Sequence, residues 1–430
     1  MGFAVVMILC ISLLLLLLFL STISRAGLQS TSTELVQLAL QRSAAAFSGP
    51  ENSFLALEDS DACSCAEFRR RGAAAHGGAG SSSSYMNRSF ADWLQANASD
   101  EEVMCAAHQA ALRPLAPGKP RVAFLFMVRG PIPHESVWRQ FFQGHEELYS
   151  IYVHAAASNS NSHESLYPNN SIFHQRQIPS KPQSRFEISM TEAQRRLLAY
   201  ALLDNTVPNS WFSLVCESSV PVRSFGYVYN YLMNSELSFV EAFFAWEWWR
   251  QGWVTTDTPQ LQDHVMRKGE AWFSVHRRHA GLIVGDFFIF PKFKEHWREG
   301  GISAEIYLPT LLNIIDPLGI ANRSTTYVNW TNPSTDSHPE TYTRANITDE
   351  LFVGIQNQRR NTHGMYVMGT RHHDCHTQDS GCIYNGVANS SCWLFARKFS
   401  GDPQDVQALL HHFTNTVVPI NPKPFYSDNN

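Results

Sequence analysis

Continuous apolar runs alternate with amphipathic stretches through the middle of the chain. Val122–Val128 (VAFLFMV) and Leu148–Ala155 (LYSIYVHA) have the apolar character of strands buried on both faces. The stretch HESVWRQFFQG between them has helical spacing and follows the breaker RGPIP. A helical pattern over Thr191–Asp204 and a third strand-like run, WFSLVCESSVPV, come next. This order predicts an α/β fold with a mixed, mainly parallel sheet flanked by helices.

The predicted strands end at residues that can carry chemistry. These ends are Arg129, His154 and the tripeptide Cys216-Glu217-Ser218. Ligands of open parallel sheets gather at the carboxyl ends of the strands. We therefore expect these residues to border a binding site.

The second half of the pattern is less regular and contains an isolated acid. AWFSVHRRHAGLIVGDFFIFPKF begins like a strand and continues as a helix, and strands are also predicted within Thr326–Trp330 and Ser391–Ser400. Glu305, in SAEIYLPTLLNI, is the only charged residue between Glu299 and Asp316. Proline suits a first helical turn, so the pattern predicts a helix that begins near Tyr307–Pro309, with Glu305 just before it.

The amino terminus predicts a membrane anchor. Gly2–Ser24 is uncharged and mostly apolar, and about 20 such residues cross a bilayer as a helix. A cleaved signal peptide is the alternative, with Ser24-Arg25-Ala26 as a cleavage site, but the apolar run is longer than a usual signal core. We predict a transmembrane signal anchor over residues 1–24, a flexible luminal stem rich in Ala, Gly and Ser over 25–118, and a catalytic domain over 119–430.

Composition and modification motifs agree with a luminal body. The 430-residue chain has a net charge of −5, so the overall balance does not favour nucleic-acid binding. Seven cysteines remain outside the apolar segment, an odd number that leaves at least one without a partner in the chain, and their pairing stays open. Glycosylation motifs, which predict a type II orientation, occur at Asn87, Asn97, Asn169, Asn322, Asn329, Asn346 and Asn389.

Glu305 and the pair Arg397-Lys398 each have two interpretations. Glu305 is either an exposed acid at a helix start or a general base held in a cleft. Arg397 and Lys398 lie in WLFARKFS between Phe395 and Phe399. They are either solvated cations on an edge strand or fixed cations that bind phosphate.

No metal site is predicted. RHHDCH at residues 371–376 contains ligand types, but neighbouring residues rarely reach one ion with good geometry. His276 and His279 are three apart, not four, with no glutamate between them. The tripeptide Asp59-Ser60-Asp61 falls in the predicted stem, before any core strand. If the chain binds a sugar nucleotide, basic side chains must therefore neutralise the diphosphate.

Seven segments together resemble a known family. VAFLFMVRGPIP, LYSIYVHA, SMTEAQRRLLAYALLD, WFSLVCESSVPV, WFSVHRRHA, AEIYLPTLL and FARKF are similar to the core-2/I-branching β-1,6-N-acetylglucosaminyltransferase-like proteins, plant branch. The resemblance covers about Arg121–Ser400. It implies a type II Golgi membrane protein with a GT-A-like fold. It also implies inverting transfer from a UDP-sugar, with N-acetylglucosamine as one candidate, to a hydroxyl of a glycan or glycoprotein, without a cofactor or an obligatory metal.

The resemblance also implies residue roles. Glu305 would be the general base, Lys398 and secondarily Arg397 would bind the diphosphate, and Arg129 and His154 would border the nucleotide. The acceptor sugar would contact Glu217, Glu241, Trp272 and Trp330.

This chain departs from the family pattern in several places. Ala304 and Ile306 replace the usual neighbours of the base, and His154 stands where the animal enzymes have an aspartate. Arg371 is the candidate second phosphate-binding residue, and Cys216 lacks its family partner, which makes it the candidate odd thiol. An inactive, membrane-anchored glycan-binding protein is therefore the alternative. A glycoside hydrolase that uses Glu305 with Glu217 or Glu241 is a third hypothesis.

Overall fold

The described part of the chain is one compact body. The computed structural model describes residues 98–156, 166–244, 261, 265–297, 301–330, 339–359 and 381–417. All of them belong to a single compact unit, Cys65–Asn430. The predicted anchor (1–24) and the predicted stem up to residue 97 lie outside the described residues. Within the described part, no helix has the length and apolar character needed to span a bilayer.

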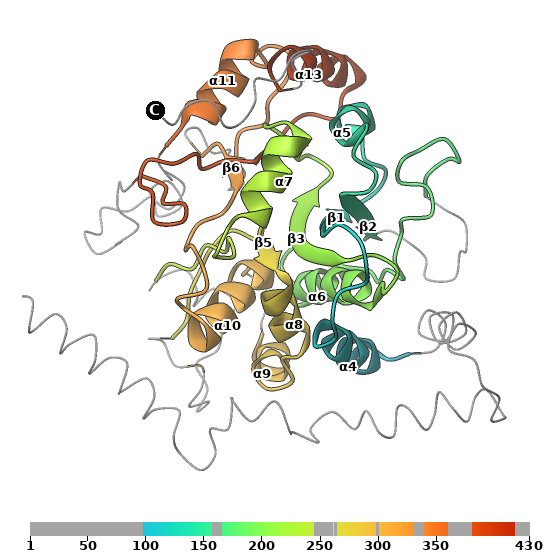
Figure 1. The fold of residues 1–430 in the computed structure, drawn as a ribbon, viewed down its shortest axis with the longest axis vertical. Coiled ribbons are helices and arrows are strands. Elements are labelled where there is room, and N and C mark those ends of the chain that lie inside the picture. Colours follow the sequence, from blue (N-terminus) through green and yellow to red (C-terminus); the bar gives the residue numbers. More distant parts are fainter. Residues whose placement is uncertain are drawn as a thin grey trace, which may run out of the picture. The chain divides into compact units, whose positions relative to one another are not determined.

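A mixed, mainly parallel sheet lies at the centre of this body (Figure 1). Its strands run in the order β2-β1-β3-β5. β1 (Arg121–Val128), β2 (Tyr149–Ala155) and β3 (Asn209–Cys216) are parallel, and β5 (Ser274–His276) is antiparallel to β3. This confirms the predicted α/β class and the first three strands, and the arrangement fits a GT-A-like fold.

Both faces of the sheet are covered, which explains why β1 is apolar from Val122 to Val128. Alternate residues of β1, Phe124 and Phe126 among them, enter an aromatic core with Trp138 of α5 (Glu135–Phe142) and Phe225 of α7 (Phe225–Met233). The residues between them face the other side, where α6 (Ser189–Leu203) contacts β1, β2 and β3. A strand buried on two faces needs apolar side chains at every position.

A smaller sheet brings the carboxyl-terminal part of the chain to the end of β3. Its order is β4-β7-β6, with β4 (Val220–Pro221) antiparallel and β6 (Thr326–Val328) parallel to β7 (Phe395–Arg397). Phe399 N donates a hydrogen bond to Ser218 O at 3.0 Å. The end of β7, with its cations, therefore lies beside the end of β3.

The remaining helices form two groups on opposite sides of the sheet (Figure 1). α8 (Arg277–Val284), α9 (Ile289–His296) and α10 (Tyr307–Ile315) lie on the side of α6. α11 (Asp349–Asn357) and α13 (Pro403–Thr416) contact each other on the side of α5. The apolar segment IFPKF forms the start of α9, because a proline is tolerated in a first turn.

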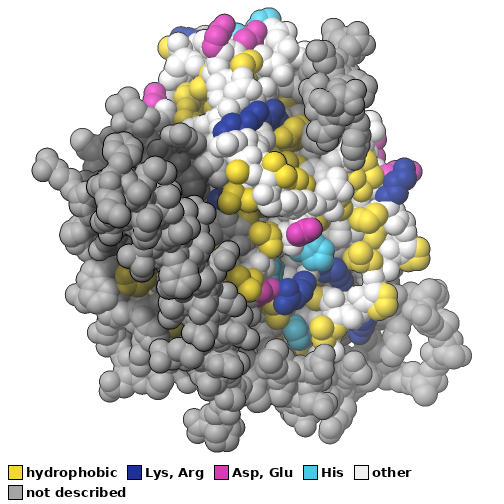
Figure 2. All heavy atoms as spheres, turned by 60° about the vertical axis from the view of Figure 1, so that its left-hand side comes forward, with side chains coloured by type: hydrophobic (Ala, Val, Ile, Leu, Met, Phe, Trp, Pro, Cys, Tyr) yellow, Lys and Arg dark blue, Asp and Glu magenta, His cyan; other side chains and the backbone are white. Residues whose placement is uncertain are grey.

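The surface carries mixed charge. On the face drawn in Figure 2, basic side chains form small groups with acidic and histidine side chains close by, and hydrophobic side chains surround them. This pattern agrees with a chain whose net charge is only −5. Binding of an anion therefore depends on individual cations and not on a broad basic field.

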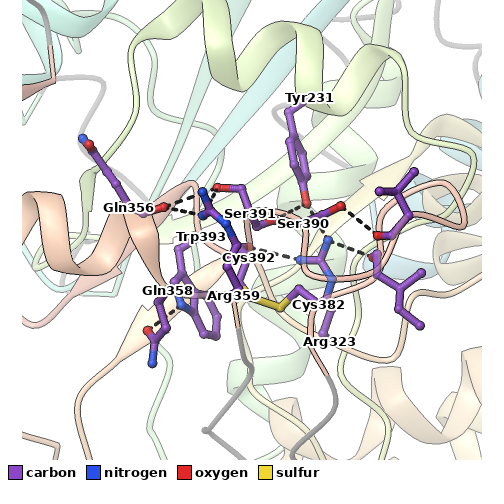
Figure 3. Close-up of a disulfide and its surroundings, with 12 residues drawn as sticks. Tyr231, Arg323, Gln356, Gln358, Arg359, Cys382, Ser390, Ser391, Cys392 and Trp393 are labelled. Atoms are coloured by element: carbon purple, nitrogen blue, oxygen red, sulfur yellow. Dashed lines mark hydrogen bonds between the residues drawn. A yellow bond between two sulfur atoms is a disulfide. The ribbon is translucent and has the colours of Figure 1, made fainter. Parts of the chain in front are cut away.

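A disulfide closes the loop that leads into β7. Cys382 and Cys392 are bonded to each other, and Arg323 lies beside them, donating to Cys392 O at 3.1 Å and to the Tyr231 hydroxyl at 2.5 Å (Figure 3). Cys105 is disulfide-bonded as well, whereas Cys216 is a buried free thiol. The expectation that Cys216 is an unpaired cysteine is confirmed.

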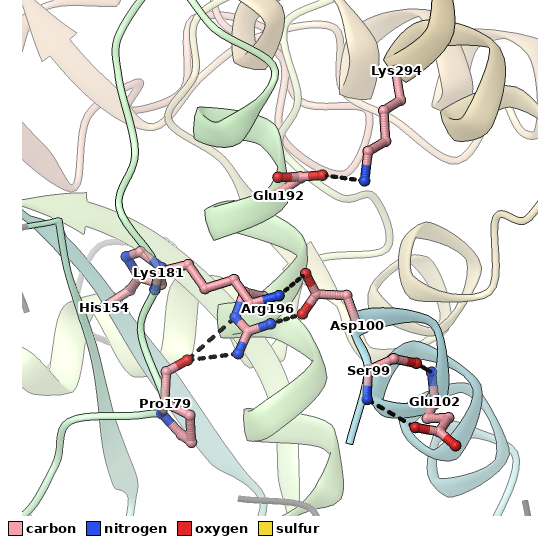
Figure 4. Close-up of polar contacts among 9 residues, drawn as sticks. All are labelled: Ser99, Asp100, Glu102, His154, Pro179, Lys181, Glu192, Arg196 and Lys294. Atoms are coloured by element: carbon pink, nitrogen blue, oxygen red, sulfur yellow. Dashed lines mark hydrogen bonds and ion pairs between the residues drawn. The ribbon is translucent and has the colours of Figure 1, made fainter. Parts of the chain in front are cut away.

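The ordered body begins earlier than the sequence predicted. The helix α4 (Asp100–Ala111), with Ser99 and Glu102 in a capping box, lies inside the segment assigned to the stem. It packs on α6 and α8, and Asp100 forms ion pairs with Arg196 of α6 and, at 2.7 Å, with Lys181 (Figure 4). The assignment of residues 100–111 to a flexible stem was wrong, because this amphipathic helix buries Val103, Met104, Cys105 and Ala107.

Candidate active site

Glu305 is held at the position that the sequence predicted, just before a helix. It ends the short 3₁₀ turn η4 (Ser303–Glu305), and α10 begins at Tyr307. The Ser303 hydroxyl accepts from Thr191 at 2.7 Å and donates to Glu187 O at 2.8 Å, which ties the turn to α6 and the loop before it. The carbonyl of Glu305 accepts from Gly269 N at 2.9 Å. The backbone around the acid is thus fixed on two sides.

The Glu305 side chain is largely buried, and it has a partner. Its Oε2 atom accepts from Lys268 Nζ at 2.7 Å, and only 18% of the side chain is exposed. Burial lowers the pKa of Lys268, but the charge and hydrogen bond of Glu305, with the charges of Glu270 and Glu241, outweigh it and raise the pKa overall. The interpretation of Glu305 as a freely exposed helix-start acid does not fit this geometry.

Glu241 lies behind this ion pair. Only 1% of Glu241 is exposed, and its carboxylate accepts from the backbone N–H of Glu270 at 3.0 Å. Gly269 lies so close that a Cβ atom there would be 1.9 Å from the Glu241 carbonyl oxygen. Glu241 is thus buried, with a backbone hydrogen bond on its carboxylate, and its predicted contact with an acceptor sugar stays a prediction.

The segment Lys268–Trp272 links the acid to the cations of β7. The guanidinium of Arg397 lies over the ring of Trp272, with its central carbon 4.5 Å from the ring centroid. Lys268 and Trp272 are four residues apart, so their Cα atoms are separated by at most about 14 Å. Glu305 contacts one end of this segment and Arg397 the other. Trp272 is 5% exposed and supports Arg397, which leaves little of its ring for the predicted stacking with a sugar.

Arg397 and Lys398 are half-buried cations without a hydrogen-bonded partner among the described residues. The Nε atom of Arg397 is buried and makes no hydrogen bond there. Burial, followed by the positive charges of Arg397, Arg185 and Arg129, lowers the pKa of Lys398 to about 8. Their interpretation as solvated edge-strand cations does not fit this partial burial.

Arg129 and Glu217 form an ion pair at the same end of the sheet. Arg129 Nε lies 2.7 Å from Glu217 Oε1, and the arginine side chain is 85% exposed. The hydrogen bond and charge of Glu217 raise the pKa of Arg129. Glu217, predicted to contact the acceptor, therefore lies in the group of cations. A rotation of the exposed Arg129 side chain would be enough to reach an anion there.

His154 is close to this edge but does not line its surface. It is fully buried near the end of β2, and its Nε2 atom accepts from Lys181 N at 3.3 Å (Figure 4). Burial lowers its pKa to about 4, so the ring is neutral at physiological pH. The predicted contact with the nucleotide is not supported, because no part of the ring is exposed.

Comparison with known proteins decides the family. The family model described as "Core-2/I-Branching enzyme" matches residues 122–356. The chain is also 31% identical over 320 residues to "Glycosyltransferase BC10" of Oryza sativa subsp. japonica, which covers 67% of this chain and 75% of the rice protein. The chain belongs to the core-2/I-branching enzyme family. The resemblance inferred from the seven motifs is thereby confirmed, and with it the prediction of a glycosyltransferase.

Of the remaining residues that the sequence of this core-2/I-branching protein singled out, some are described by the structure and others are not. Trp330 is half-buried just beyond β6, and its role stays a prediction. Arg371, the RHHDCH cluster, Asp59-Ser60-Asp61 and the sequons at Asn87 and Asn97 lie outside the described residues. Among the described residues, no group of three or more His, Cys, Asp or Glu side chains is arranged to hold a metal ion.

The described sequons differ in accessibility, and their use stays a prediction. Asn169 and Asn389 are exposed. Asn322 is exposed too, but its Oδ1 atom accepts from Ala242 N at 2.7 Å. The amide nitrogens of Asn329 and Asn346 both donate to Glu340, at 2.7 and 3.4 Å.

Sequence reasoning missed two charged residues of the site. Lys268 was passed over because RKGEAW reads as an ordinary polar connection. Arg185 lies in a loop without periodicity, and no local pattern connects it with Lys398. Both become visible only when segments far apart in the chain meet.

Proposed function

We propose that this protein is an inverting glycosyltransferase that moves a sugar from a UDP-sugar to a hydroxyl of a glycan or glycoprotein. N-acetylglucosamine is the candidate sugar by resemblance to the family. The observation that carries the proposal is the pair of half-buried cations, Arg397 and Lys398, that have no hydrogen-bonded partner in the described part of the chain. Such cations fit an anionic ligand, and a diphosphate suits Arg and Lys.

Glu305 acts as the general base in this proposal. Its carboxylate takes the proton of the acceptor hydroxyl while that oxygen forms a bond to the anomeric carbon of the donor. The bond from this carbon to the diphosphate breaks, and UDP leaves with the electron pair, so the configuration inverts. Arg397 and Lys398, with Arg129 and Arg185 nearby, stabilise the negative charge that develops on the leaving group.

The base assignment is tested with Glu305→Gln. We expect transfer to fall by about 10² to 10⁴-fold, the range for loss of a general base, while UDP binding stays within about twofold of wild type. Turnover is measured as UDP release from a panel of UDP-sugars, and binding by calorimetry. Glu147→Gln is the matched control, because the Glu147 side chain is 78% exposed and pairs with Lys119 at the surface. Wild-type turnover in Glu305→Gln would refute the assignment.

Calorimetric titration with UDP, together with the turnover assay, separates this proposal from the two alternative functions. A glycan-binding protein without transferase activity would bind glycan and ignore UDP, and a glycoside hydrolase would release sugar without any nucleotide. Lys398→Ala should weaken UDP binding by about 10 to 150-fold, which corresponds to roughly 1.5–3 kcal/mol for a charge-assisted contact. Lys119→Ala, whose side chain is 69% exposed, serves as the control.

We further propose that transfer needs no divalent metal, because fixed cations neutralise the diphosphate. Activity in excess EDTA should equal activity in added Mn²⁺ within about twofold, since a side-chain ammonium is not removed by a chelator. Loss of turnover in EDTA that Mn²⁺ restores would contradict this.

Placement in the Golgi membrane, type II with the catalytic body in the lumen, is part of the same proposal and rests on the apolar segment Gly2–Ser24 and the sequons.

A further inference from the structure

Lys268 lies in an unusual setting for a lysine. It is 12% exposed by side chain, and its ammonium donates to Glu305 Oε2 at 2.7 Å. The charges of two more acids, Glu270 and Glu241, also act on it, and these residues are 7% and 1% exposed. Lys268 is thus a largely buried cation that lies near three largely buried acids.

The backbone fixes Lys268 in this place. Lys268 and Phe243 exchange two hydrogen bonds, Phe243 N to Lys268 O at 2.8 Å and Lys268 N to Phe243 O at 2.9 Å. Gly269 permits this approach, because any side chain there would meet the Glu241 carbonyl. Gly269 N also donates to Glu305 O. The lysine and the acid are therefore held together by main chain as well as by their charges.

The two oxygen atoms of Glu305 are not equivalent. Oε2 accepts from Lys268, whereas Oε1 accepts no hydrogen bond from any residue in the described part of the chain. The Glu305 side chain keeps 18% of its surface exposed. One oxygen is thus anchored, and the other has no hydrogen-bonded partner in the described part of the chain.

We propose that Lys268 is the positioning residue of the general base: it anchors Oε2 and keeps Glu305 ionised, so that Oε1 receives the acceptor proton. This rests on the proposed function of Glu305. Without the ammonium, the largely buried Glu305 carboxylate would lose its charged partner, and burial without a counter-ion favours the protonated form of an acid. A protonated Glu305 cannot act as a base.

The other charged groups on elements that contact η4 have partners elsewhere. On and before α6, Glu192 pairs with Lys294 at 2.9 Å, and the Glu187 carboxylate accepts from Ser189. Arg195 donates to the carbonyls of Val284 and Asp286, and Asp286 on the α9 side accepts from the Tyr307 hydroxyl of α10. Among the described residues, Lys268 is therefore the cation that contacts the Glu305 carboxylate.

The test is the pH dependence of kcat/KM for Lys268→Met and Lys268→Arg in the full chain, with a UDP-sugar that the wild type uses. Lys268→Met removes the charge and keeps the length of the side chain. The acidic limb of the kcat/KM profile should therefore move to higher pH by about 1 to 3 units. The value of kcat/KM should fall on the acidic side of the profile. Lys268→Arg should keep the wild-type limb, and UDP affinity should be unchanged in both. A purely structural lysine would alter stability without moving the limb.

Glu270→Gln is the second variant, in case Lys268→Met does not fold. Removing one competing negative charge should move the acidic limb to lower pH, the opposite direction. If the limb stays in place in every folded variant while Glu305→Gln is inactive, the positioning role is refuted and the proposed function stands. If Glu305→Gln itself retains wild-type turnover, the proposed function fails first.

Discussion

Two lysines in this enzyme show how the surroundings decide what the same side chain does. Lys268 is enclosed by carboxylates, and their charges outweigh burial and raise its pKa. Lys398 is half-buried among arginines, so burial and like charges act together and lower its pKa to about 8. A cation whose charge is already satisfied suits positioning, and one whose charge is not suits binding of an anion.

The lowered pKa of Lys398 predicts how UDP binding depends on pH. Below about pH 8 the free enzyme carries the ammonium, and above it the amine is neutral. UDP affinity should therefore weaken, by at most about tenfold per pH unit, above about pH 8. Calorimetry across this range measures it. Lys398→Arg, which stays charged, should remove the dependence, and a persistent decline in that variant would show that another group is responsible.

At the scale of elements, the sequence predicted strands and helices most accurately where the hydrophobic pattern is both long and uniform. β1, β2 and α6 lie within a few residues of their predicted bounds, because burial on both faces or a clear helical period leaves a strong pattern. α4 was missed because the Ala- and Ser-rich sequence before it masked its start, although Ser99 and Glu102 form a capping box. α13 was also missed, although Asp402 and Pro403 mark its beginning.

The place of α4 in the body predicts a specific stability effect. Arg196 is 5% exposed and its guanidinium pairs with Asp100, so Asp100→Ala leaves a buried cation without its carboxylate. We expect the free energy of unfolding to fall by about 3 kcal/mol, as for a broken buried pair. Glu101→Ala, at an exposed position one residue later, should change it by less than about 0.5 kcal/mol. Denaturant unfolding followed by tryptophan fluorescence measures both, and equal values would show that α4 is not part of the cooperative body.

At the scale of the whole molecule, buried histidines link stability to pH. Burial lowers the pKa of His134, His154 and His279, which lie in different parts of the described body. His279 bridges Ser238 and Asp316 at 2.7 and 3.1 Å, but Ser238 is 1% exposed, so this Ser-His-Asp arrangement is a structural link and not a hydrolytic site. In each case the folded protein favours the neutral ring.

Acidification should therefore destabilise the protein. The unfolded His154 takes up a proton near pH 6.5 and the folded one only near pH 4, so stability is fully present above about 6.5 and is lost as the pH falls toward 4. The contribution of His154 amounts to about 3 kcal/mol over this window. His154→Gln should flatten the pH profile of the unfolding free energy by this amount, and exposed His411→Gln should leave it unchanged. An unchanged profile in His154→Gln would contradict the argument.

The sequence by itself determined the class of the fold, the family and the position of Glu305 before a helix. These follow from local patterns, because periodicity, capping residues and short motifs act over a few neighbouring residues. Arg397 and Lys398 were also identified from a local pattern, because both lie in the short motif FARKF.

Only the tertiary structure decided what surrounds these residues. Two contacts join segments that are 30 or more residues apart: the pairing of Lys268 with Glu305 and the packing of Arg397 on Trp272. The burial of Glu241 and His154 depends on which segments cover them. Ionisation and exposure depend on distances through space, and these are set by how the two sheets and their helices pack. No local pattern in the chain carries that information.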